Sequence, residues 1–86
     1  MTDVSFIQMC KETVRDYANA HLDKTDKAEI TTDDVYIVWF CKTLQNWKAL
    51  VSTTLTDGMY YELTHNGDKS ETYVDAYKKW ENYTVK

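Results

Sequence analysis

Hydrophobic and polar positions divide the chain into one helical segment and a series of short extended segments. Within residues 3–22 the apolar side chains recur at steps of three and four, which is the period of one helix face. The members of this stripe are Ile7, Cys10, Val14, Tyr17 and His21, with Phe6 and Ala18 beside them, and Lys11, Glu12, Arg15, Asp16 and Asn19 lie opposite. Thr2 or Asp3 can cap the first turn. The pattern predicts an amphipathic helix that packs through one face.

The apolar period stops after this helix and a strongly apolar segment follows. Residues 23–34 are nearly all polar, which predicts a solvated connection. Residues 35–41 are apolar at every position, whereas a half-exposed strand would alternate with polar residues. This run predicts a central strand that is covered on both faces. Because only one helix is predicted, the second cover would be the C-terminal segment or another copy of the chain.

Two dipeptides with glycine mark turns in the second half of the chain. Asp57-Gly58 and Asn66-Gly67 contain its only two glycines, and such pairs supply the positive φ angles of tight hairpin turns. Residues 47–55 read as the hairpin partner of the apolar strand, and residues 59–64 as a third strand. In residues 47–55, one side of the strand is expected to carry Trp47, Ala49, Val51 and Leu55. In residues 59–64, one face is expected to carry Tyr60, Glu62 and Thr64, and the other Met59, Tyr61 and Leu63.

The last segment fits two structures. Residues 71–77 have the composition of a fourth strand, yet Tyr73, Tyr77, Trp80 and Thr84 also fit a helical step. We favour the strand, followed by a tail or a short helical turn. The fold class is therefore α+β, with an N-terminal amphipathic helix packed on an antiparallel three- to four-stranded β-meander and a short C-terminal helix as an option. Residues 1–86 form one domain.

Composition and charge limit the class of protein, its location and the kind of partner that it can bind. The chain has 86 residues, of which 43% are hydrophobic and 28% charged, so it is too apolar for disorder. The longest apolar run, residues 35–41, is far short of the roughly 20 residues of a transmembrane helix. The first residues lack the basic and apolar regions of a secretory signal, so a cytoplasmic location is expected. A net charge of −4 opposes nucleic-acid and membrane binding and favours a basic partner surface.

No set of residues has the spacing of a metal site or a catalytic site. Cys10, His21, Cys41 and His65 are zinc-ligand types, but they lack the close pairs that zinc sites use. The acidic residues around the connection, which are Asp23, Asp26, Glu29, Asp33 and Asp34, lack the pattern of a calcium loop and are expected to be solvated. We expect reduced cysteines, no metal, no cofactor and no enzymatic activity.

The aromatic residues are the remaining functional signal. Aromatic side chains make up 14% of the chain, more than one small core holds, so some should be exposed for a partner. Trp and Tyr are favoured at interfaces because they bury a large area with few rotatable bonds. The predicted partner-binding residues are Trp47, Tyr60, Tyr61, Glu62, Tyr73, Asp33 and Asp34.

Several segments together resemble a known family. These are residues 33–39, 41–46, 48–50, 57–62, 66–69 and 75–79. The chain resembles a family of small uncharacterised proteins encoded by phages and prophages of Gram-positive bacteria. The resemblance carries no catalytic residues and implies an accessory protein in the host cytoplasm. Such a protein would bind and inhibit a host macromolecule, such as a restriction or CRISPR effector. The alternative is an oligomer, for example a homodimer, that binds a nucleotide-like ligand.

Overall fold

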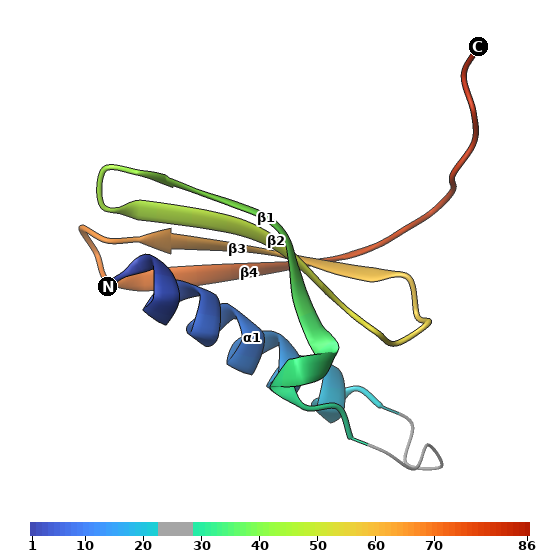
Figure 1. Cartoon of the computed structure of the whole chain (residues 1–86), viewed down its shortest axis with the longest axis horizontal. Coiled ribbons are helices and arrows are strands. Elements are labelled where there is room, and N and C mark those ends of the chain that lie inside the picture. Colours follow the sequence, from blue (N-terminus) through green and yellow to red (C-terminus); the bar gives the residue numbers. More distant parts are fainter. Residues whose placement is uncertain (23–28) are drawn as a thin grey trace.

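The computed structural model shows one helix packed on one face of a four-stranded antiparallel sheet (Figure 1). It describes residues 1–22 and 29–86, so the first half of the predicted polar connection lies outside the described residues. The strands follow the chain in the order β1-β2-β3-β4. The α+β meander is therefore confirmed, with four strands. Its elements are α1 (Asp3–Ala20), a 3-10 turn η1 (Thr32–Asp34), β1 (Val35–Thr43), β2 (Asn46–Thr53), β3 (Met59–Asn66) and β4 (Glu71–Lys78).

Helix α1 begins at a reciprocal cap. The Thr2 hydroxyl accepts from the Ser5 N–H at 3.1 Å, and the Ser5 hydroxyl accepts from the Thr2 N–H at 2.8 Å. The buried stripe steps by four and not through the predicted set: Ile7 and Tyr17 lie half-buried beside it, and His21 is exposed at the C-cap. No helix in the described part of the chain is long and apolar enough to cross a membrane. The buried residues of α1 are Phe6, Cys10, Val14 and Ala18.

The core lies between α1 and the alternating side chains of β2 and β3. Strand register places Val51 opposite Tyr61, Ala49 opposite Leu63 and Trp47 opposite His65, and all six are buried. Phe6 stacks on Trp47, while Tyr17 meets the edge of Tyr61, so α1 runs in the direction of β2. The predicted division of β3 into two faces is confirmed, because Tyr61 and Leu63 are buried and their neighbours are only partly so.

The prediction that residues 35–41 form a central strand is wrong. Strand β1 pairs only with β2 and lies at an edge of the sheet. Its register shifts between Ile37 and Trp39, which leaves Val38 as an extra bulged residue. Four large apolar side chains of β1 remain 40–47% exposed. The apolar run correctly indicates that the strand has much apolar surface, but it does not indicate whether another segment covers that surface. The four are Tyr36, Val38, Trp39 and Phe40.

The two glycines serve different purposes. Gly58 has φ +70°, as predicted for a tight turn. At the other turn the positive φ belongs to Ser70 (52°), so the prediction for Gly67 is wrong. Gly67 instead lies against Gln45 of the β1–β2 turn: a Cβ there would be 2.0 Å from the Gln45 carbonyl oxygen. It therefore lets two neighbouring turns approach each other.

The chain beyond β4 leaves the sheet. The Lys79 N–H donates to the Gly58 carbonyl at 2.7 Å, and residues 79–86 then form neither helix nor strand. This tail projects away from the body in Figure 1, and Trp80 is 97% exposed. The optional C-terminal helix is thus absent, and the tail does not cover the second face of the sheet.

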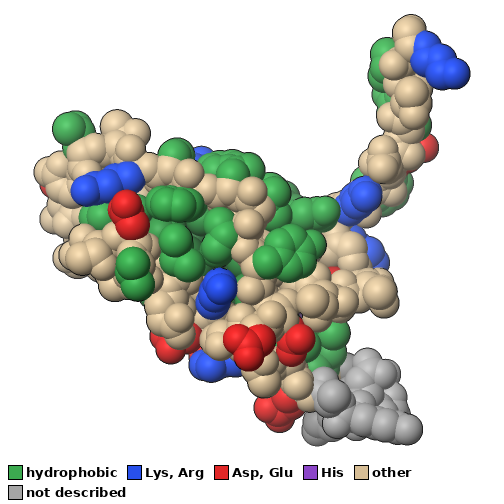
Figure 2. Space-filling model, viewed as in Figure 1, with side chains coloured by type: hydrophobic (Ala, Val, Ile, Leu, Met, Phe, Trp, Pro, Cys, Tyr) green, Lys and Arg blue, Asp and Glu red, His purple; other side chains and the backbone are tan. Residues whose placement is uncertain are grey.

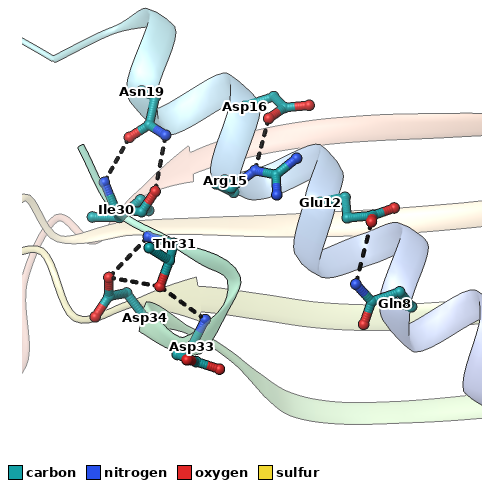
Figure 3. A network of polar contacts seen from close by, with 9 residues as sticks. All are labelled: Gln8, Glu12, Arg15, Asp16, Asn19, Ile30, Thr31, Asp33 and Asp34. Carbon is teal, nitrogen blue, oxygen red and sulfur yellow. Dashed lines mark hydrogen bonds and ion pairs between the residues drawn. The ribbon is translucent and has the colours of Figure 1, made fainter.

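Side-chain hydrogen bonds fasten the chain between α1 and β1 (Figure 3). The Asn19 amide donates to the Ile30 carbonyl at 3.0 Å and accepts from the Ile30 N–H at 2.9 Å. The Asp34 carboxylate accepts from the Thr31 N–H at 2.9 Å and closes a capping box on η1. Ile30 is held against the core in this way, and β1 starts at a defined position.

Candidate interaction surface

The side of the sheet that faces away from α1, called here the open face, is the main candidate for a functional surface. Residues directly opposite one another on paired strands point to the same side of a sheet. Figure 2, in the orientation of Figure 1, shows hydrophobic side chains at the surface over the strands, and strand register assigns residues to the two faces. By register, three rows cross the open face from β1 to β4: Tyr36, Ser52, Tyr60 and Tyr77; Trp39, Leu50, Glu62 and Asp75; Cys41, Lys48, Thr64 and Tyr73.

Aromatic side chains occupy the periphery of the open face. Tyr36 and Trp39 come from edge strand β1, whereas Tyr73 and Tyr77 come from β4 at the other edge. Each of the four is 44–51% exposed. Tyr60 lies between them on β3 and is half-buried. Large aromatic rings that remain half in water, grouped on one face, are the usual anchors of protein interfaces.

The middle row of the open face carries an excess of negative charge. The Lys48 ammonium lies 3.4 Å from the Glu62 carboxylate. Glu62 is also directly opposite Asp75 on β4, and like charges in such a position repel. Among the described residues, only Glu62 of these two carboxylates has an ion-pair partner. A basic side chain from a partner would relieve this repulsion.

A further acidic residue lies beside Tyr73. The Tyr73 hydroxyl donates to the Glu71 carboxylate. This hydrogen bond raises the pKa of Tyr73, because it stabilises the protonated phenol beside a negative charge. The phenol is thereby held in one orientation at the rim of the open face.

Sequence reasoning identified only part of this surface. Tyr60, Glu62 and Tyr73 lie on the open face, but Trp47 and Tyr61 are buried in the core, at 5% and 2% exposure. Asp33 and Asp34 lie in η1, away from the three rows, and Asp34 is used as a cap. Tyr36, Trp39 and Tyr77 were missed. The first two belong to the apolar run that predicted a strand buried on both sides, so their exposure had no signal in the sequence.

Trp47 and Tyr61 are held in the core by contacts with α1. The Trp47 indole N–H donates to Asp3 at 2.9 Å, and the Lys42 ammonium lies 4.9 Å from its ring centroid. Trp47 thus joins the first turn of α1 to the sheet. Burial is the main reason that the pKa of Tyr61 is raised, with smaller contributions from Asp57 and Tyr17.

A second candidate is an open hollow of about 640 Å³ at the end of the sheet where α1 begins. His65 lies in its wall and hydrogen-bonds through Nδ1 to the Thr72 hydroxyl at 2.8 Å. Lys42 and Gly67 also line it. A cation and an imidazole in the wall of an open hollow are suited to a small anionic ligand.

The four zinc-ligand types do not come together. Cys10 is fully buried in the core, where burial raises the pKa of its thiol to about 12. Cys41 is exposed on the open face, His21 ends α1 and His65 lies in β3. Within residues 1–22 and 29–86, no three His, Cys, Asp or Glu side chains form a group that could hold a metal ion.

Fold and surface together define a small α+β protein with one helix-covered sheet face and one open face that is rich in aromatic residues. A family model matches residues 7–86 of the chain. The chain belongs to this family, which is described as a family of unknown function (DUF6275). No curated protein and no solved structure matches the chain.

Proposed function

We propose that this protein is a non-enzymatic binding protein that holds a partner protein on the open face of its sheet. The observation that carries the proposal is a sheet face with four half-exposed aromatic residues around a pair of opposed carboxylates. The finer proposal is that the partner belongs to a bacterial host, in which a phage or prophage accessory protein blocks it. That step rests on the resemblance of the sequence to phage-encoded proteins.

The hydrophobic contribution comes from the two edges of the open face. Each aromatic side chain buries about 150–250 Å² when it is fully enclosed, and roughly half of that area is still in water here. At about 25 cal/mol per Å², covering one such ring contributes about 2 kcal/mol before ordering costs. Trp39 and Tyr77, on opposite edges, are therefore expected to be the strongest contacts.

The electrostatic contribution comes from the middle row. A partner Arg or Lys placed between Glu62 and Asp75 would turn a repulsive pair into a bridged one. The acidic net charge of the chain also favours the approach of a basic surface. A basic groove on a nucleic-acid-handling protein has this character.

Affinity capture from a Gram-positive bacterial lysate tests the proposal. Trp39→Ala should remove the captured partner, because Trp39 lies on the open face. Trp80→Ala is the matched control, because Trp80 lies in the tail and touches no face of the sheet. Asp75→Lys should weaken capture more strongly at low salt than at high salt. Equal capture by all variants, or no specific partner, contradicts the proposal.

The hollow beside His65 supports a second candidate function, the binding of a small anionic ligand such as a nucleotide. Lys42 and His65 would contact the anion. A thermal-shift screen with nucleotides tests it, and Lys42→Ala should abolish any shift whereas Lys78→Ala should not. A uniform absence of shifts removes this candidate and leaves the open-face proposal untouched.

A further inference from the structure

The two edges of the sheet are built differently. An exposed edge strand carries unpaired backbone N–H and C=O groups, and proteins usually protect it with charged residues, Pro or bulges. The β4 edge follows this rule, since Glu71, Asp75 and Lys78 lie along it. The β1 edge does not, because residues 35–41 carry no charge at all. The bulge at Val38 is the protective feature that β1 does have.

The apolar side chains of β1 supply a small contact area. The exposed parts of Tyr36, Val38, Trp39 and Phe40 amount to about 300 Å² in each copy, given areas of about 150–250 Å² for an aromatic residue. Two copies therefore contribute about 600 Å², to which the backbone and flanking residues add, whereas a standard interface buries about 1,600 Å². This area suits a weak, concentration-dependent dimer.

Charges at the two ends of β1 select the orientation. Asp33 and Asp34 precede the apolar run, and Lys42 follows it. When two copies of β1 lie antiparallel, the acidic end of each strand faces the basic end of the other, so the pair gains two attractive charge contacts. A parallel arrangement would instead oppose like charges, which destabilises neighbouring strands. If Lys42 of one copy lies opposite Asp33 or Asp34 of the other, the two-fold axis between the strands passes within one residue of Val38.

We propose that two copies of the chain pair antiparallel through β1 and form one eight-stranded sheet. The two-fold axis between antiparallel strands is perpendicular to the sheet, so both open faces lie on the same side. Tyr36 and Trp39 of the two copies then meet at the middle of a doubled surface. Tyr36 and Trp39 belong to both proposed surfaces, whereas the test position Val38 lies outside the three rows of the open face, so the dimer can be tested separately from partner binding.

Light scattering after size-exclusion chromatography tests the association. Because interfaces below about 1,200 Å² are weak, the measurement runs from about 10 μM to about 1 mM protein. The intact chain, of 10.1 kDa, should shift from monomer to dimer across this range. Val38→Lys should remain monomeric, because a charge on an edge strand blocks pairing. Val74→Lys, on the β4 edge at similar exposure, should dimerise normally. Circular dichroism confirms that both variants fold.

An engineered cysteine tests the strand and the register. Val38→Cys in a Cys41→Ser background should form an intermolecular disulfide under mild oxidation, since opposed Cα atoms lie about 4.5–5.5 Å apart. Native Cys41 should not cross-link, because the proposed registers separate its two copies by about 20 Å along the strand. A monomer at every concentration overturns the proposal. So does a dimer that survives Val38→Lys and leaves Val38→Cys uncross-linked.

Discussion

Replacement of Gly67 by Ala should destabilise the fold for a steric reason. Gly67 does not have a positive φ, so in open space Ala would be neutral or would stabilise by about 0.4–1 kcal/mol. Here the new Cβ would lie 2.0 Å from the Gln45 carbonyl oxygen and 2.9 Å from the Gln45 carbonyl carbon. Both are backbone atoms, so one of the two turns must move by about 1 Å or more.

Overpacking of this kind costs about 1–3 kcal/mol. We expect a loss of about 2 kcal/mol in the free energy of unfolding, measured by urea denaturation. For a domain of this size, that loss lowers Tm by about 10 °C. Gln45→Gly should not rescue the variant, because the clash with the carbonyl oxygen remains. An unchanged or increased stability of Gly67→Ala would refute the reasoning.

Gly58 provides the matched comparison. A Cβ there meets nothing closer than 3.9 Å, but the residue has φ +70°. Gly58→Ala should lower stability by about 1–2 kcal/mol through backbone strain, whereas Gly58→Asn should lower it less, since Asn tolerates the left-handed region. At Gly67, Asn should be no better than Ala. Equal responses to Asn at both glycines would show that the two positions do not differ in this way.

The remaining predictions concern the cysteines and the first turn of α1. In the folded protein one thiol, that of Cys41, should react quickly with a maleimide, and Cys10 should react only on unfolding, as mass spectrometry would show. Burial raises the pKa of the Cys10 thiol from 9.0 to about 12, so the unfolded state loses this proton at a lower pH than the folded state does. The free energy of unfolding should therefore fall as the pH rises through this range, by up to about 1.4 kcal/mol per pH unit. Urea denaturation at several pH values checks this prediction. In Cys10→Ala the free energy of unfolding should fall less steeply with pH than in the unchanged protein, and equal slopes would show that Cys10 is not the cause. Asp3→Ala should lower stability by about 1–2 kcal/mol, because it removes the acceptor of the Trp47 indole. In a Trp47→Phe background Asp3→Ala should have little further effect, and full additivity in this double-mutant cycle would exclude the hydrogen bond as the cause.

Local features of the sequence predicted most of the elements. The three-to-four spacing of apolar residues predicted α1, and the alternation along residues 59–64 predicted which side of β3 is buried. Gly58 predicted the β2–β3 turn correctly. These features depend on residues close together in the chain, where helix and strand periods act directly on the pattern.

The candidate surface was only partly predictable. Tyr60 and Glu62 share a face by strand parity, which sequence reasoning can follow, whereas Tyr73 joins them through the register of β3 and β4. Trp47 and Tyr61 were equally good candidates by composition. Their burial depends on which side of the sheet α1 covers, and that is a contact between distant parts of the chain.

The sequence by itself determined one helix, the first three strands, the turn at Gly58 and the two faces of β3, because hydrophobic period and turn chemistry are local. Tertiary structure decided that the apolar strand β1 lies at an edge, that the tail leaves one sheet face open, and that Gly67 serves close packing between two turns. Each of these features depends on which distant segment packs against a residue. The pattern of side chains shows which surfaces are apolar, but it does not show which segment packs against them.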